Sequence, residues 1–257
     1  MLQRYFNSLD DLGITTNYKL KEIINVLLNF SIKCGYIQSN PLKYIHIVGK
    51  DNKRYQDKQV ISNHEFKLVI DEILETKTYI HYSFVIALYI GRYTGLRISE
   101  TFALERDDFD FDNHLLNVNK KMVYANKRND ELYVTHTMKT KSSQSILPLH
   151  HDLEIIIKKW FEYHKYQYVI TNNKGKFISP KQLEYCLWNI SKKHNISIHY
   201  HMLRHTLASN LIINGANVKA TQEILRHANI KTTMNIYTHS NLELNARELN
   251  LAFKRHE

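Results

Sequence analysis

Residues 79–100 read YIHYSFVIALYIGRYTGLRISE and indicate a mainly helical protein. Positions 79–93 are almost continuously apolar or aromatic, which favours a helix that is buried on most sides. Gly95 follows, and glycine readily takes the left-handed conformation that ends a helix. Arg97 is therefore predicted to lie at the start of a new short helix.

Helical patterns flank this stretch on both sides. Upstream, Ser62 and Glu65 form a capping box ahead of an apolar stripe. Downstream, Asp152 is predicted to cap a helix, and Ser179 followed by Pro180 begins another, with proline where its missing N–H costs nothing. The predicted downstream helices cover residues 153–164, 180 onward, 201–213, 218–226, 232–238 and 242–253.

Short β-rich segments interrupt the helices at 115–118, 132–135 and 145–147. Polar, charged turns separate them, so they predict one small antiparallel sheet of two or three strands. The expected fold class is mostly α, of the α+β type. It is a helical domain with a small antiparallel β-sheet, preceded by a short helical segment.

The chain is expected to divide into residues 1–50, a linker over 51–60 and a main domain over 61–257. The linker is polar and basic. The first unit has one amphipathic helical pattern, which is too little to fold alone and needs something to pack against. Its apolar positions at helical spacing are Leu20, Ile23, Ile24, Leu27 and Phe30.

Composition limits the classes of function. The net charge of +10 and the pI of about 9.3 favour a polyanionic partner, with nucleic acid ahead of an anionic membrane. No run of about 18 apolar residues occurs, so we expect no membrane span. The first residues lack the apolar segment of a secretion signal, which predicts a cytoplasmic protein. Cys34 and Cys186 are expected to be two buried free thiols.

Four stretches carry candidate chemistry: TGLRISE at 94–100, KTKSS at 139–143, HMLRHT at 201–206, and LRH at 225–227 with TTMNIY at 232–237. Taken singly, each has an ordinary interpretation as a surface cation, a solvated loop, a polar helix face or a packed tyrosine. His199, His201 and His205 also raise a metal site. This is disfavoured because no acidic ligand lies in the segment and Arg204 is electrostatically unsuited to it.

Together, the four stretches resemble the tyrosine recombinases, the phage integrase family, in their order, spacing and local wording. The resemblance spans about residues 60–240 of the chain. It implies a nucleophilic tyrosine that attacks a DNA phosphorus, becomes joined to the 3′ phosphate and leaves a free 5′ hydroxyl. The catalytic residues that the resemblance implies are Arg97, Lys139, His201, Arg204, His227 and Tyr237.

Each of these residues has an implied role. Arg97 and Arg204 hold the non-bridging oxygens, because a guanidinium fork offers parallel donors and keeps its charge. Lys139 is the implied general acid, with Lys141 as the alternative. His201 is expected to transfer a proton at a pKa near working pH. His227 is expected to hydrogen-bond the same phosphate that Tyr237 attacks.

The resemblance also implies a reaction without a metal or nucleotide cofactor. The expected partners are double-stranded DNA and further copies of the chain, as a tetramer on synapsed DNA, in a bacterial or phage-encoded mobile element. Three alternatives remain: a truncated relative that binds recombination sites without cutting, a type IB topoisomerase, and a metal-dependent nuclease.

Three features depart from the family pattern. Arg226 stands where the family usually has glycine, and Ser145 stands where an arginine is often found. Residues 1–50 are expected to be a partial core-binding region, since only the segment FSIKCGYIQSNPL resembles the end of that domain. Glu100 is expected to support its neighbours as a nearby carboxylate.

Overall fold

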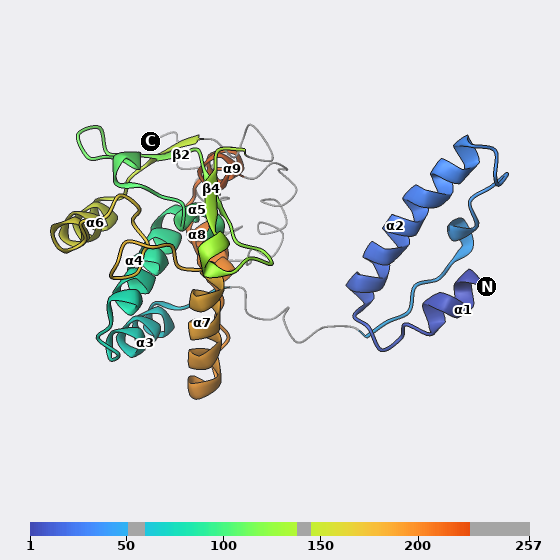
Figure 1. The fold of residues 1–257 in the computed structure, drawn as a ribbon, viewed down its shortest axis with the longest axis horizontal. Helices are drawn as coiled ribbons and strands as arrows, with labels where there is room; N and C mark the ends of the chain where they lie inside the picture. The colour runs from blue at the N-terminus through green and yellow to red at the C-terminus, as the bar shows by residue number, and fades with distance from the viewer. Residues whose placement is uncertain (51–59, 138–144, 227–257) are drawn as a thin grey trace, which may run out of the picture. The chain divides into compact units, whose positions relative to one another are not determined.

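The computed structural model describes residues 1–50, 60–137 and 145–226, and the chain divides into two compact units, Met1–Lys58 and Gln59–Glu257 (Figure 1). In the N-terminal unit, a short helix α1 (Leu2–Asn7) precedes a long helix α2 (Ile14–Lys33) and a 3-10 turn η1 (Pro41–Tyr44). Gly35 takes a φ of 75° just after α2, the left-handed conformation in which glycine commonly ends a helix.

The buried amide of Asn17 ties the N-terminal unit together. Its Nδ2 donates to the carbonyl of Leu9 at 2.8 Å and to that of Val48 at 2.7 Å, so that α2 is joined to the segments on either side of it. Few apolar side chains support this unit, since Phe6 and Leu42 are its buried hydrophobic residues among those described. A polar side chain therefore does much of the work that a hydrophobic core does in a larger domain.

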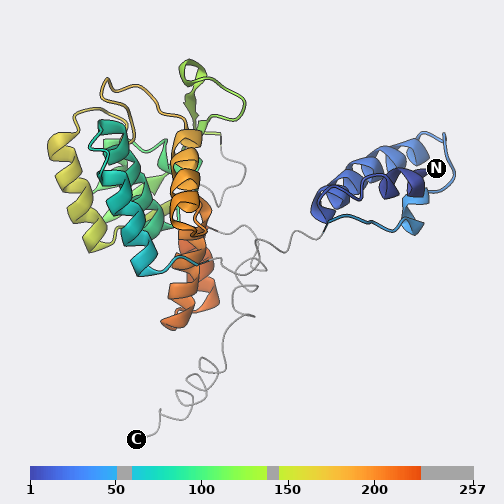
Figure 2. The same ribbon diagram turned by 90° about the horizontal axis from the view of Figure 1, so that it is seen from below.

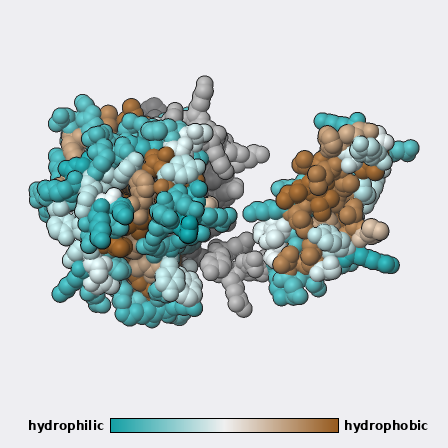
Figure 3. Space-filling model, in the orientation of Figure 1, coloured by the Kyte–Doolittle hydropathy of each residue, from teal (hydrophilic) through white to brown (hydrophobic). Residues whose placement is uncertain are grey.

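The apolar face of α2 is exposed within its own unit. Ile23 and Leu27 are each 61% exposed and Phe30 is 62% exposed, and Figure 3 shows this face as a brown band along the helix. The described residues of this unit do not provide the packing that the sequence pattern requires. The prediction of two buried thiols is wrong, because Cys34 at the end of α2 is exposed and Cys186 is only half-buried; both are free.

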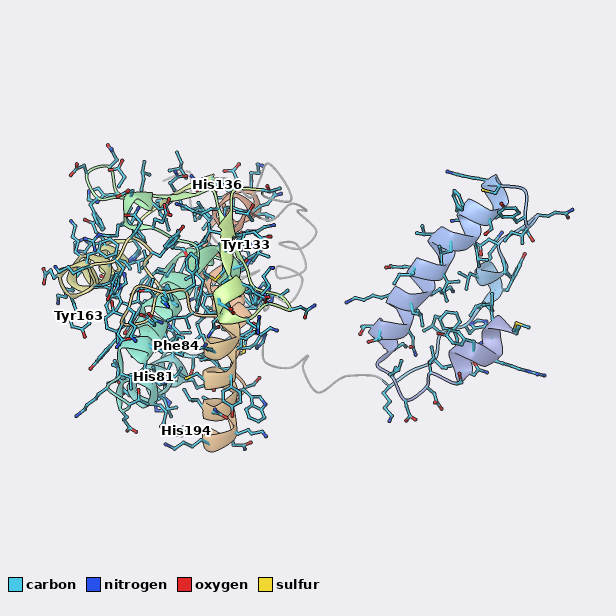
Figure 4. The ribbon with its side chains drawn as sticks, viewed as in Figure 1. His81, Phe84, Tyr133, His136, Tyr163 and His194 are labelled. Carbon is cyan, nitrogen blue, oxygen red and sulfur yellow. The ribbon has the colours of Figure 1, made fainter. Side chains whose placement is uncertain are left out.

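Seven helices build the described part of the second unit. They are α3 (Asn63–Leu74), α4 (Tyr79–Thr94), α5 (Ile98–Thr101), α6 (His151–Tyr163), α7 (Pro180–His194), α8 (Tyr200–Ile213) and α9 (Val218–Leu225). Helix α4 is central, because α3, α5, α6 and α8 all contact it (Figure 2). Phe84, labelled in Figure 4, is one of many α4 side chains buried in this core, so the apolar stretch that opened the sequence forms the centre of the unit.

The helix ends follow local chemistry, with one exception. The capping box is confirmed, since Ser62 Oγ accepts from the Glu65 N–H at 3.2 Å and Glu65 returns a bond to the Ser62 N–H at 3.0 Å. The cap predicted at Asp152 is wrong. His150 caps α6 instead, and its Nδ1 accepts from the Asp152 N–H at 3.2 Å, because the helix begins earlier than the apolar pattern indicates.

The described residues form two small antiparallel sheets where one was predicted. The first has the order β1-β2-β5, with β1 at Phe109–Asp110, β2 at Leu115–Val118 and β5 at Ser145–Pro148. The second pairs β3 (Lys121–Val123) with β4 (Tyr133–Thr135). The sequence pattern missed β1 and β3 because strands of two or three residues are too short to show an alternation. A single-turn 3-10 helix η3 (Arg106–Asp108) leads into β1, and another, η4 (Asn129–Glu131), lies between β3 and β4.

A close crossing of α4 and α8 brings two of the sequence motifs together. A Cβ at Gly91 would lie 2.6 Å from the Tyr200 hydroxyl oxygen, so only glycine lets the two helices approach this closely. The Tyr200 hydroxyl bonds the carbonyl of Ala87 at 3.1 Å and Thr101 Oγ1 at 2.8 Å, which links α8 to both α4 and α5. In the described residues, no helix has the length and apolar character that a membrane crossing requires.

Candidate active site

Arg97 projects from the turn between α4 and α5. Gly95 makes the turn with a φ of 62°, and a Cβ there would lie 2.9 Å from Leu225 Cδ2, so backbone conformation and space both require glycine. Arg97 is the N-cap of α5, as predicted. Its backbone N–H donates to Glu100 Oε2 and its Nη1 to Glu100 Oε1, both at 2.9 Å. The Arg97 side chain remains 41% exposed, so part of the guanidinium is accessible.

Arg204 lies on α8 and is buried. Its Nη1 donates to the carbonyl of Gly95 at 2.7 Å and its Nη2 donates to the carbonyl of Leu225. One planar fork therefore joins the turn that carries Arg97 to the end of α9. Burial, and next the positive charges of Arg97 and Arg226, lower the pKa of Arg204 to about 9, which leaves the side chain charged at neutral pH.

Glu100 connects two arginines. It is 3% exposed. Its Oε1 accepts from the Arg97 guanidinium, and its Oε2 accepts from the Arg97 backbone N–H and, at 2.7 Å, from Arg226 Nη2. Burial alone would raise the pKa of Glu100, but the Arg226 charge and then the bonds and charge of Arg97 lower it below its ordinary value. The expectation of a supporting carboxylate therefore agrees with the geometry. The Arg226 partner was not predicted, because no local pattern links positions 126 apart.

The cluster has more positive than negative charge. Three guanidinium groups, those of Arg97, Arg204 and Arg226, are close enough for each charge to affect the pKa of another, and Glu100 is the carboxylate among them. A buried excess of positive charge is costly in a low-dielectric interior unless an anion compensates for it. The arrangement is therefore suited to binding an anion such as a phosphate.

Three histidines lie at the start of α8. The rings of His201 and His205 meet edge to face with centroids 4.7 Å apart. Desolvation by the surrounding protein, and next the charges of His205 and Arg204, lower the pKa of His201 to about 4. The ring keeps an exposed edge, so solvent screens part of this effect, but the direction leaves the imidazole neutral at pH 7. This direction differs from the expected titration of His201 near working pH, because desolvation and then the neighbouring charges disfavour its protonated form.

The remaining predicted site residues, Lys139 with its alternative Lys141, His227 and Tyr237, lie outside the described residues. The described chain ends on either side of the lysine segment, after β4 and before β5. His136, labelled in Figure 4, follows β4 directly. Arg226 immediately precedes His227. Of the six predicted residues, the structure thus describes Arg97, Arg204 and His201.

A metal centre is not apparent in the described segments. No group of three or more His, Cys, Asp or Glu side chains there is arranged to hold an ion.

Known proteins resemble this chain over the part that contains the candidate site residues. A model of the phage integrase family matches residues 59–243. The tyrosine recombinase XerC of Pediococcus pentosaceus is 27% identical over 199 residues, which cover 76% of this chain and 62% of that protein. XerC of Lacticaseibacillus casei is 30% identical over 133 residues, covering 51% of this chain and 42% of that protein. The chain therefore spans less than two thirds of the length of these relatives.

Solved structures share the fold. The Tn1549 transposon integrase in complex with a circular intermediate DNA matches with a TM-score of 0.79 and 21% identity, covering 94% of this chain and 80% of that one. A lambda integrase dimer bound to a COC′ core site matches with a TM-score of 0.64 and 14% identity, covering 87% of this chain and 59% of that one. At these identities the likeness concerns the fold, which agrees with the predicted mostly α class with a small antiparallel sheet.

Proposed function

Because this chain belongs to the phage integrase family, we propose that it is a site-specific DNA recombinase that cuts and rejoins DNA through a 3′-phosphotyrosyl intermediate. The observation that carries the proposal is the arginine cluster around Glu100. Arg97 is held on one side and accessible on the other, and Arg204 is buried and charged. Such a pair of guanidinium groups suits the two non-bridging oxygens of a phosphodiester.

In the proposed reaction, the hydroxyl oxygen of Tyr237 attacks the phosphorus of one strand. The new P–O bond to tyrosine forms as the bond from phosphorus to the 5′ oxygen breaks. Lys139, or Lys141 in its place, gives a proton to the leaving 5′ oxygen, and His201 in its neutral form accepts the proton of the tyrosine hydroxyl. Rejoining reverses these steps with the 5′ hydroxyl of another strand.

Arg97 and Arg204 stabilise the charge that grows on the phosphorane, and His227 adds a hydrogen bond to the same group. In its neutral form, the His201 imidazole has a free lone pair that can accept the tyrosine proton, which a protonated imidazole lacks. The roles of Lys139, His227 and Tyr237 rest on their positions in the sequence motifs.

The proposed partners are double-stranded DNA and further copies of this chain. The net charge of +10 supports DNA binding, and the integrases that share the fold are described as DNA complexes, one of them a dimer. Strand exchange between two duplexes requires several active sites, so we propose a tetramer on synapsed DNA. We place this assembly in the cytoplasm of a bacterium, because the XerC relatives are bacterial.

Covalent trapping tests the proposal. Nicked duplexes from the DNA that flanks the gene are incubated with the protein, and an adduct that survives denaturing electrophoresis is expected with the unmodified chain. Tyr237→Phe should bind DNA with unchanged affinity and form no adduct. The matched control is Tyr163→Phe, which alters an exposed tyrosine at the end of α6 and should trap normally (Figure 4).

Each other outcome identifies an alternative. Gel shifts without an adduct from the unmodified chain indicate a relative that occupies recombination sites without cutting them. Cleavage that EDTA abolishes indicates a metal-dependent nuclease. Relaxation of random plasmid DNA without a preferred site indicates a topoisomerase. An adduct that persists in Tyr237→Phe means that another residue is the nucleophile.

A further inference from the structure

The fold alone does not explain why an arginine occupies position 226. It is the C-cap of α9 and takes φ 55° and ψ 44°, a left-handed conformation that favours glycine and is unfavourable for a residue with a Cβ. Its side chain is 1% exposed, so a charged group has also been taken out of water. Position 226 therefore combines an unfavourable backbone with an unfavourable burial.

The contacts of the Arg226 guanidinium point to a single partner. Its Nη2 donates to Glu100 Oε2 at 2.7 Å. Its Nε and Nη1 are buried and have no hydrogen-bond partner among the residues that the structure describes. Buried donors are normally satisfied, so two unmatched N–H groups make this an expensive way to cap a helix. Among the described residues, the hydrogen bond of the Arg226 guanidinium goes to the Glu100 carboxylate, so any effect of this group on the site is expected to pass through Glu100.

Glu100 transmits this contact to Arg97. Its Oε2 accepts from both the Arg226 Nη2 and the Arg97 backbone N–H, and its Oε1 accepts from the Arg97 Nη1. The carboxylate therefore fixes the backbone and the guanidinium of Arg97 at once. This works only while Glu100 is ionised, because a protonated carboxyl loses acceptor capacity and most of its attraction for a cation.

We propose that Arg226 is a positioning residue, which holds the Glu100 carboxylate by a hydrogen bond and, through that carboxylate, fixes the Arg97 guanidinium for the DNA phosphate. The inference rests on the proposed function for the identity of the phosphate. The contact between Arg226 and Glu100 stands on the geometry alone. Arg226 thus connects the end of α9 to the start of α5 through Glu100. The guanidinium of Arg204 connects the end of α9 to the turn before α5 in a similar way.

The charged groups around Glu100 shift its pKa, so removal of one of them is expected to change the pH at which Glu100 ionises. Burial raises its pKa, and the Arg226 charge is the largest effect that lowers it, ahead of the Arg97 bonds. The β3 strand also packs on α5, and its Lys121 is not among the charges that shift the Glu100 pKa. Among the residues that the structure describes, the titratable or charged groups that face Glu100 are Arg97 before α5, Tyr200 and Arg204 on α8, and Arg226 after α9.

The central variant is Arg226→Gly, which suits the left-handed backbone and removes the guanidinium. The matched control is Asn195→Gly, which relieves a left-handed C-cap of α7 at φ 50° and does not touch Glu100. We expect adduct formation at saturating DNA to slow by about tenfold to a hundredfold in Arg226→Gly, the size of a lost hydrogen bond to a charged group. Asn195→Gly should keep the rate of the unmodified chain, and DNA affinity should be unchanged in both.

Two readouts separate positioning from simple loss of structure. The rate of Arg226→Gly should fall more steeply than that of the unmodified chain as the pH is lowered, because Glu100 binds a proton at a higher pH. Millimolar methylguanidinium should restore part of the rate in Arg226→Gly and should not affect Asn195→Gly. Arg226→Lys should give an intermediate rate, since a point charge replaces the fork.

A measurement that needs no activity keeps the two proposals apart. The Glu100 carboxyl carbon can be followed by NMR as the pH is changed, in the unmodified chain, Arg226→Gly and Asn195→Gly. A Glu100 pKa that rises only in Arg226→Gly supports the inference. An unchanged Glu100 pKa, an unchanged adduct rate or the absence of methylguanidinium rescue each overturns it. The absence of an adduct from the unmodified chain overturns the proposed function instead.

Discussion

Substituting Gly91 by alanine perturbs the crossing of α4 and α8, which sets the position of Arg204. The added Cβ would lie 2.6 Å from the Tyr200 hydroxyl oxygen, 2.7 Å from its Cζ and 3.0 Å from Leu203 Cδ1. The ring cannot turn aside freely, because it is buried and its hydroxyl has hydrogen bonds to α4 and α5. The two helices must therefore separate, or the ring must give up these bonds.

Two effects of opposite sign decide the magnitude. Alanine in a helix interior is favoured over glycine by about 1 kcal/mol. Overpacking a well-filled core costs about 1–3 kcal/mol, and losing a Tyr200 hydrogen bond costs about 0.5–1.5 kcal/mol more. The net result is a loss of about 0.5–3.5 kcal/mol in the free energy of unfolding. For a domain of this size, that lowers the Tm by about 1–14 °C.

Thermal and urea denaturation measure the stability, and covalent trapping measures the effect on the site. Because Arg204 lies one helical turn from Tyr200, the adduct rate of Gly91→Ala should fall even where the protein is fully folded. Tyr200→Leu on the alanine background should recover stability relative to the sum of the two single changes, since the shorter side chain removes the collision. A Gly91→Ala protein as stable as the unmodified chain would refute the claim that this crossing requires glycine.

Three further outcomes follow from the described contacts. Arg204→Lys should lose about 1.5–3 kcal/mol of stability by calorimetry, because one ammonium cannot bond both carbonyls that the fork now joins, and its adduct rate should fall by orders of magnitude despite the conserved charge. Thr206→Val should cost about 1–3 kcal/mol in urea denaturation by leaving the buried Ile61 N–H without its acceptor, whereas Thr206→Ser should keep the bond. Glu72 has a lowered pKa, first through its hydrogen bond from Lys193, so its stabilising effect is present above the ordinary carboxyl pKa and is lost as pH falls. Glu72→Gln should therefore be less stable by up to about 1 kcal/mol at pH 7 and equally stable in acid, and a constant difference across pH would contradict this assignment.

Local chemistry explains what the sequence predicted well. The capping box at Ser62 and Glu65 and the left-handed turn at Gly95 involve residues a few positions apart, so composition and spacing specify them. The central helix α4 was predictable because a continuous apolar run has one stable solution in a domain of this size. Arg97 could be placed at the start of α5 because the turn at Gly95 lies only two residues before it.

Long-range pairing explains what the sequence predicted poorly. The bond between Arg226 and Glu100 joins positions 126 apart, and nothing at either position indicates the other. The short strands β1 and β3 exist only because partners hold them. The lowered pKa of His201 depends first on its desolvation in the folded chain and then on nearby charges, so residue type alone did not predict it. The roles of Lys139, His227 and Tyr237 remain predictions from their motifs.

The hydrogen bond from the Ile61 N–H to Thr206 Oγ1 has a mechanical consequence. It connects the first residues of the second unit to α8 across 145 positions of sequence, two residues beyond Arg204. Thr206 also bonds the Met202 carbonyl, so the linkage is anchored in the helix backbone. A force on the backbone at Ile61 is therefore transmitted directly to α8, the helix that carries Arg204, and not through either sheet. A force applied to the first residues of this unit is therefore expected to change the position of Arg204.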